Sequence, residues 1–185
     1  MIKRLSKWLF LNVWGWKVQG ELPEAPKYLI VVAPHTSNWD FLVGILFRKY
    51  TENFEPMYLA KKELFVFPIG FFFRWTGGYP VERGKNTNFV DDVVSVFDKN
   101  EKFCTTIAPE GSRSYRKKWK TGFYYIAKNA SIPILRIAFD YPSKTLVLDD
   151  LYYITKDADS TVIEFKEYFS KYKGKNPQNG IIWPE

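Results

Sequence analysis

The single histidine of the chain, His35, lies directly after an apolar run, and Asp40 follows it five residues later. A strand that ends before His35 and a helix that begins near Asp40 can fold the chain back so that the carboxylate reaches the imidazole. Asp40 would then fix the tautomer of His35 and stabilise its protonated form. The pair is therefore a candidate general base with its orienting acid. The alternative is a histidine that only packs and an aspartate that favours a helix start.

A second group of polar residues follows the apolar run 102–108. It is predicted to form a tight glycine turn made of Glu110, Gly111, Ser112 and Arg113. Residues 113–120 contain several cations and no anion, and the planar guanidinium of Arg113 can bind phosphate through two parallel hydrogen bonds. The remaining cations of this run are equally compatible with a loop that faces water.

A third segment, residues 61–83, is too apolar for a stretch that faces solvent. One interpretation is a core helix that is broken at Pro68. The other is a hydrophobic wall for a fatty chain, formed by residues 64–75, with Lys61 and Arg83 as flanking candidates for binding phosphate.

Alternating strand-like and helical segments must hold these residues in place. Apolar runs predict strands at 27–33, 57–60, 79–81, 102–108, 132–139 and 145–148. Helices are predicted at 39–50, 87–98, 121–129 and 160–172. This alternation implies a single α/β domain with a central, mostly parallel sheet flanked by helices. Ligands bind outside the carboxyl ends of strands in such a sheet, which is where His35 and Glu110 are expected.

Composition limits the chemistry further. With 185 residues, of which 46% are apolar, the chain can form one sizeable core and is not a disordered polyelectrolyte. A single cysteine, Cys104, excludes an internal disulfide, and a single histidine excludes a two-histidine metal site, so no metal is expected. The formal net charge of +7 favours anionic partners. The 19% aromatic content favours a membrane surface among them, because Trp and Tyr prefer the polar–apolar boundary.

Residues 1–20 predict an N-terminal amphipathic helix. Its apolar stripe is formed by Ile2, Leu5, Leu9, Val13 and Trp16, with the cations away from it. The apolar part is far shorter than the roughly 20 residues needed to cross a bilayer. We therefore expect this helix to lie in a membrane interface, with residues 21–185 as the main domain. The alternative is an ordinary helix that packs on that domain.

Four short blocks in order carry a family resemblance. They are His35-x4-Asp40; Lys61-x-Glu63-Leu64 with Pro68, Gly70, Gly78 and Arg83; Pro109-Glu110-Gly111-Ser112-Arg113-Ser114; and Ile132-Pro133-Ile134. In their order and spacing they resemble the blocks of the glycerolipid acyltransferases, and the nearest type is the bacterial 1-acylglycerol-3-phosphate acyltransferases. The resemblance extends from about residue 33 to residue 135.

The resemblance implies an enzyme that moves a fatty acyl group from an acyl thioester, carried by coenzyme A or acyl carrier protein, to a hydroxyl of a lysophospholipid. The implied acceptor is 1-acylglycerol-3-phosphate, which would give phosphatidic acid in phospholipid biosynthesis. His35 is then the base and Asp40 its partner. The implied substrate-binding residues are Lys61, Arg83, Glu110, Gly111, Ser112 and Arg113. Because the thioester is a substrate, no cofactor is expected.

We expect attack by the acceptor hydroxyl itself, without a covalent enzyme intermediate, so neither Cys104 nor Ser37 serves as a nucleophile. Backbone N–H groups near His35 or Gly111 are expected to stabilise the oxyanion. The expected partners are the thioester donor, the lipid acceptor, an anionic membrane surface and, where it is the donor, acyl carrier protein, but no nucleic acid. The expected location is peripheral, on the cytoplasmic face of the cell membrane.

Two other functions remain open. The same pair could acylate another amphiphile, such as a lyso-aminolipid or a lipid A-type acceptor. A non-catalytic membrane or nucleic-acid binding module would also explain the basic and aromatic residues, but it leaves His35, Asp40 and Glu110 without a role.

Overall fold

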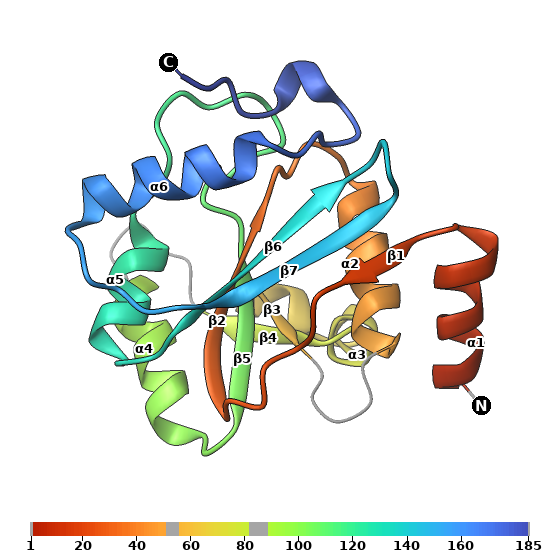
Figure 1. The fold of residues 1–185 in the computed structure, drawn as a ribbon. Helices are drawn as coiled ribbons and strands as arrows, with labels where there is room; N and C mark the ends of the chain where they lie inside the picture. Colours follow the sequence, from red (N-terminus) through yellow and green to blue (C-terminus); the bar gives the residue numbers. More distant parts are fainter. Residues whose placement is uncertain (1, 51–55, 82–88, 185) are drawn as a thin grey trace.

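The computed structural model describes residues 2–50, 56–81 and 89–184, and Figure 1 shows their arrangement. Seven strands form one sheet in the order β1-β7-β6-β2-β5-β3-β4. All neighbouring strands pair in parallel except β6 and β7, which are antiparallel. The predicted α/β class with a mostly parallel sheet is therefore confirmed.

The strands are β1 (Lys17–Gln19), β2 (Lys27–Ala33), β3 (Met57–Lys61), β4 (Gly78–Val81), β5 (Phe103–Ile107), β6 (Ile134–Asp140) and β7 (Thr145–Tyr152). The helices are α1 (Ile2–Trp8), α2 (Trp39–Tyr50), α3 (Ile69–Trp75), α4 (Phe89–Lys99), α5 (Gly122–Asn129) and α6 (Ala158–Ser170). Short helical turns cover Leu9–Val13, Lys62–Phe65 and Pro177–Asn179. The sequence did not predict β1, and the first two residues of the predicted helix 87–98 lie outside the described residues.

The central strand β2 explains why the sheet has helices on both faces. Its side chains alternate between two cores: Leu29 and Val31 contribute to the one that includes residues of α4, α5 and α6, whereas Tyr28 and Ile30 contribute to the one that includes residues of α2 and the N-terminal segment. A strand buried on both sides needs a continuous apolar sequence, which is the pattern that predicted it. This burial fixes the carboxyl end of β2, after which His35 and the other polar residues of the turn follow.

The N-terminal segment differs from its prediction. Phe10 is fully buried and packs against Trp16 and Phe47, so the segment is attached to the domain. Leu5 and Val13, which belong to the predicted stripe, are exposed, as a stripe that faces a membrane interface would be. Trp16 departs from the prediction: the chain forms only a short helix and a π-helical turn before Gly15, so Trp16 lies beyond the helical part and is buried. Within the ranges that the structure describes, no helix combines the length and apolarity needed to span a bilayer.

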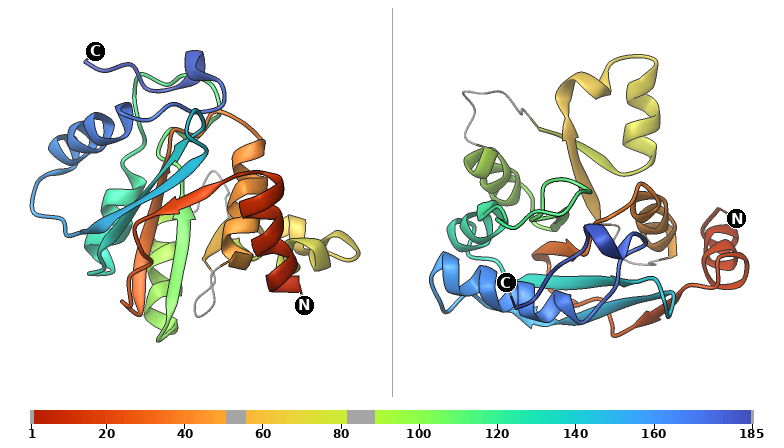
Figure 2. Two further views of the ribbon diagram at one scale, coloured as in Figure 1. Left: turned by 45° about the vertical axis from the view of Figure 1, so that its right-hand side comes forward. Right: turned by 90° about the horizontal axis from the view of Figure 1, so that it is seen from above.

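The segment between β3 and β4 projects from the sheet, as the right-hand view of Figure 2 shows. Gly70 is essential to its turn, because a Cβ there would lie 2.1 Å from the carbonyl oxygen of Phe65. Phe65 is buried, but most of the apolar side chains that follow it are exposed. The expectation of a core helix broken at Pro68 is therefore wrong.

Candidate active site

The chain turns sharply between β2 and α2 and places Asp40 against His35. Nδ1 of His35 lies 3.0 Å from Oδ2 of Asp40, and the same oxygen accepts the backbone N–H groups of Thr36 (2.9 Å) and Ser37 (3.0 Å). The Asp40 side chain is 1% exposed and that of His35 is 21% exposed. A carboxylate acceptor places the proton on Nδ1, so Nε2 of His35 is left with a lone pair that can accept a proton.

The other carboxylate oxygen of Asp40 is held by Tyr141, which follows β6. The Tyr141 hydroxyl donates to Oδ1 at 2.5 Å, and the Tyr141 ring packs edge-on against Trp16 with the centroids 5.0 Å apart. Burial, together with the hydrogen bond to Asp40 and its charge, raises the pKa of Tyr141. The hydroxyl therefore stays protonated and donates. Tyr141 was not predicted from the sequence, although it follows β6 directly, as His35 follows the end of β2.

Glu110, from the turn after β5, holds the backbone of this site. Its Oε2 accepts the backbone N–H of His35 at 2.7 Å, and the side chain is buried. The pKa of Glu110 is raised to about 8, chiefly by burial; the hydrogen bond from the His35 N–H lowers this pKa, and the charge of Asp40 raises it. Glu110 is therefore mostly protonated at neutral pH. It joins the ends of β2 and β5 without adding a second full negative charge beside Asp40.

The glycine turn after β5 brings two cations to the site. Gly111 has a φ of +66°, and a Cβ there would lie 2.7 Å from Cε of Lys120. The positive φ favours glycine at this position, and the end of the Lys120 side chain lies across it. The residues Gly111, Ser112, Arg113 and Lys120 all line one cavity together with His35 and Asp40.

This cavity has a volume of about 720 Å³ and is polar only in part. Its apolar wall includes Ile30, Val32, Phe41, Ile45, Met57 and Leu59, which come from β2, α2 and β3. As far as the described residues show, no residue of the segment 64–75 contributes to it. The predicted fatty-chain wall at 64–75 is therefore wrong, and the apolar space of the site lies between α2 and the sheet.

The comparison with protein families fits this geometry. A model of the acyltransferase family matches residues 16–140, which include the His35–Asp40 pair and the glycine turn. The chain belongs to the acyltransferase family. This match confirms the family resemblance of the four sequence blocks. A search of the curated proteins finds no match.

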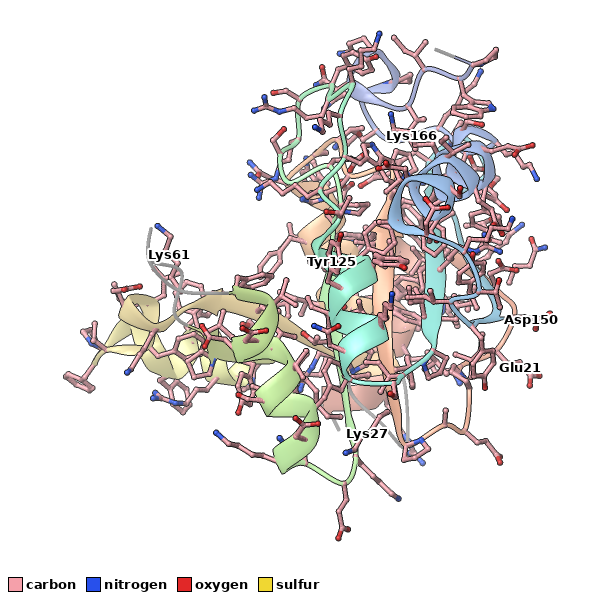
Figure 3. All side chains as sticks on the ribbon, turned by 90° about the vertical axis from the view of Figure 1, so that its left-hand side faces the viewer. Glu21, Lys27, Lys61, Tyr125, Asp150 and Lys166 are labelled. Carbon is pink, nitrogen blue, oxygen red and sulfur yellow. The ribbon has the colours of Figure 1, made fainter. Side chains whose placement is uncertain are left out.

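Not all of the remaining predicted site residues of this acyltransferase lie at the cavity. Lys61 is exposed at the end of β3 and is not among the residues that line the cavity, and Figure 3 shows its side chain away from the body of the molecule. Arg83 lies outside the described residues. The later cations of the basic loop, Arg116, Lys117 and Lys118, are exposed. Only Arg113 and Lys120 of that loop reach the cavity.

The expected oxyanion donors are already engaged elsewhere in the acyltransferase. The N–H of His35 donates to Glu110, and those of Thr36 and Ser37 donate to Asp40. The N–H of Gly111 donates to the carbonyl oxygen of Ala108 at 3.1 Å. These four N–H groups build the turns themselves. An oxyanion donor among the residues that follow Gly111 stays a prediction.

The two other nucleophile types near the acyltransferase site are unsuited to attack. Cys104 is buried within β5, and burial raises the pKa of its thiol to about 12. Ser37 is buried, and its Oγ accepts the N–H of Trp39 at 3.2 Å. In the part of the chain that the structure describes, no group of three or more His, Cys, Asp and Glu side chains could hold a metal ion.

The C-terminal segment supports the turn that carries His35. Asn176 donates through its backbone N–H to Oγ1 of Thr36 (3.1 Å) and through Nδ2 to the Thr36 carbonyl oxygen (2.8 Å). A Cβ on Gly174 would lie 2.4 Å from Oγ1 of Thr36, so glycine permits this close approach. The sequence analysis missed both residues, because nothing in a segment 140 residues away signals this contact.

Proposed function

We propose that this acyltransferase moves a fatty acyl group from an acyl thioester, of coenzyme A or acyl carrier protein, to the hydroxyl of a lysophospholipid. The proposed acceptor is 1-acylglycerol-3-phosphate, and the product is phosphatidic acid. The observation that carries the proposal is one cavity. His35, Asp40, Arg113 and Lys120 line part of it, and apolar side chains line the rest. An acid–base pair, an anion-binding group and space for a hydrocarbon chain are the three parts that this reaction requires.

His35 acts as the general base in this proposal. The acceptor hydroxyl donates to Nε2, and its oxygen attacks the thioester carbonyl carbon while its proton passes to the imidazole. The C–S bond then breaks, and the imidazolium returns the proton to the leaving thiolate. A thiol with a pKa of about 8.5 is a competent leaving group. Asp40 stabilises the imidazolium between these two steps.

Arg113 and Lys120 supply positive charge for the acceptor phosphate. Both line the cavity that contains His35, and the Arg113 guanidinium can form two parallel hydrogen bonds to phosphate oxygens. The raised pKa of Glu110 matters here, because an ionised carboxylate at this turn would repel the phosphate. Ser112 and Gly111 shape the turn that carries Arg113. Lys61 and Arg83 stay candidates for binding the acceptor and its phosphate.

A release assay tests the proposal. Purified protein is mixed with an acyl-CoA, free thiol is followed over time, and the products from a panel of acceptors are identified by mass spectrometry. We expect thiol release that depends on a lysophospholipid. His35→Ala should lower the rate about a thousandfold, within the range of general base catalysis, with an unchanged unfolding midpoint. Normal turnover by the variant would remove His35 from the mechanism.

The acceptor panel also separates the acceptor classes. Arg113→Ala should lower the rate with 1-acylglycerol-3-phosphate at least tenfold more than the rate with an uncharged monoacylglycerol. Lys118→Ala is the matched control, because Lys118 is an exposed cation of the same loop that is not among the cavity-lining residues. Equal losses on both acceptors would argue against a phosphate contact. If the enzyme acylates only a lyso-aminolipid or a lipid A-type acceptor, the proposed acyl transfer stands and the proposed acceptor is wrong.

We further propose that the enzyme works as a peripheral protein on the cytoplasmic face of the membrane, where it takes its acceptor from the bilayer and its donor from water. The exposed apolar side chains of the N-terminal segment, Leu5, Trp8 and Val13, support this. The buried Phe10 keeps the same segment attached to the domain.

A further inference from the structure

Residues 62–75, which we call the α3 hairpin, carry an exposed apolar surface. The side chain of Phe67 is 95% exposed and that of Phe71 is 77% exposed. The other exposed apolar side chains of the hairpin are Leu64, Val66, Ile69, Phe72 and Trp75. Soluble proteins rarely leave so many neighbouring apolar side chains in water, and such patches mark interaction sites. The exposed apolar surface of the hairpin is therefore a candidate interaction site.

The hairpin presents this surface from a fixed base. Phe65 is buried beneath it, and the Arg74 guanidinium lies over the Phe65 ring, 5.6 Å from its centroid. At the end of α3, Oγ1 of Thr76 donates to the carbonyl oxygen of Phe72 at 2.9 Å and is hydrogen-bonded to the Tyr58 hydroxyl at 2.6 Å. These contacts tie the end of α3 to β3, the strand from which the hairpin starts. The exposed side chains thus belong to an ordered element.

The shape of the hairpin suits contact with an extended surface. Figure 2 (right) and Figure 3 both show it projecting beyond the sheet and the other helices at the β4 edge. Its base also belongs to the site, because Tyr58, Leu59 and Thr76 line the cavity that contains His35. A partner that binds the projecting surface would therefore lie next to the cavity wall.

Charge decides between the partners that could cover this surface. Within the described residues 61–75, the cations Lys61, Lys62 and Arg74 are exposed, and Glu63 is the one carboxylate of this range. A second copy of the chain would bring these cations together across the interface, which is unfavourable. An anionic bilayer accommodates both features, because apolar and aromatic side chains enter the interface while the cations meet the headgroups.

We propose that the α3 hairpin is the surface through which this enzyme docks on an anionic lipid bilayer. The proposal rests on the function proposed above, in which the acceptor and the product are lipids. Insertion of Phe67 and Phe71 would hold the cavity wall formed by β3 at the lipid surface. An acceptor could then enter the site without crossing water.

Vesicle flotation tests the docking surface without any turnover. The full chain and the Phe67→Asp/Phe71→Asp variant are each floated with vesicles of phosphatidylcholine alone and with added phosphatidylglycerol. We expect the variant to lose at least tenfold in its partition onto the anionic vesicles. Lys62→Glu should weaken binding to the anionic vesicles more than to the neutral ones. The matched control is Ile163→Asp, at an exposed apolar position of α6 outside the hairpin, and it should bind like the unaltered chain.

Turnover then separates this proposal from the function on which it rests. The double variant should lose activity on an acceptor embedded in vesicles and keep it on a short-chain acceptor dispersed below its micelle concentration. If neither protein acylates any acceptor, while flotation still depends on Phe67 and Phe71, the docking surface stands and the proposed reaction falls.

Two results would overturn the docking proposal. One is flotation of the double variant equal to that of the unaltered chain. The other is a dimer of the unaltered chain, seen by light scattering, that the same substitutions convert to a monomer, because a second copy would then cover the surface. The single variant Phe67→Asp controls for misfolding of the double variant. The Phe67 side chain is 95% exposed, so its replacement removes little packing.

Discussion

Asp40 accepts hydrogen bonds on both carboxylate oxygens, and the one on Oδ1 comes from Tyr141. Without this donor the carboxylate is fixed on one side only, by the turn that carries His35. A hydrogen bond to a charged group contributes roughly 1.5–3 kcal/mol, so Tyr141 is an important part of the orientation of Asp40. We regard Tyr141 as a positioning residue, because it acts on the reaction through Asp40.

Tyr141→Phe should lower kcat about tenfold and leave the KM for the acyl thioester unchanged, as expected when only part of the general base contribution is lost. Steady-state kinetics with the acyl thioester as the varied substrate measure both constants. A variant with an unchanged kcat would leave Tyr141 with a packing role only.

At the scale of elements, helix α2 carries both the acid of the site and one wall of the cavity. Gly44 lies on the cavity side of α2, and a Cβ at this position would meet no atom within 4 Å. Its neighbours on the cavity wall, Phe41 and Ile45, are apolar. A side chain added at Gly44 would therefore occupy space that we assign to the acyl chain.

Gly44→Leu should shift the preference of the enzyme toward short acyl donors. We expect the rate with a sixteen-carbon thioester to fall more than about tenfold, the scale set by a few lost methylene contacts, while an eight-carbon thioester is used as before. Gly44→Ala should give a smaller shift in the same direction. The unfolding midpoint should rise in both variants, because glycine costs a helix about 1 kcal/mol relative to alanine. Equal losses at every chain length would place the acyl chain elsewhere.

Element-level patterns account for much of the site. The continuous apolar run of β2 predicted a buried strand, and the rule that ligands bind at carboxyl ends of parallel strands led to His35 and Glu110. Composition could not decide whether residues 64–75 are buried, because a large part of any protein surface is apolar. Periodicity also placed Trp16 on the N-terminal stripe, although it belongs to the core. Because Phe10 and Trp16 belong to the core, deletion of that segment would disturb the fold as well as any membrane contact.

Contacts between distant segments were beyond prediction from the sequence. Tyr141 and Asn176 reach the turn that carries His35 across 101 and 140 residues of chain. Each contact depends on how the sheet and its antiparallel pair β6–β7 fold as a whole, and no local pattern encodes that arrangement. The raised pKa of Glu110 has the same origin, because it arises from burial in the assembled site.

At the scale of the whole molecule, the free energy of unfolding should therefore depend on the ionisation of Glu110. The pKa of Glu110 is raised from 4.5 to about 8 in the folded protein, so the folded state binds more protons than the unfolded state between these values. The free energy of unfolding must then fall as the pH rises from 5 to 8. The groups with lowered pKa, Asp157 and Glu164, act at lower pH, where their contribution is lost as the pH falls.

Urea unfolding at several pH values between 5 and 9 measures this effect. The unaltered chain should lose on the order of 4 kcal/mol across this interval, since one unit of pKa difference corresponds to about 1.4 kcal/mol. Glu110→Gln keeps a neutral acceptor for the His35 N–H and should give a much flatter profile, with the variant the more stable protein at pH 9. Parallel profiles would show that Glu110 is ionised in the folded protein. The negative charge would then lie beside the proposed phosphate site, and the reason given for phosphate binding there would fail.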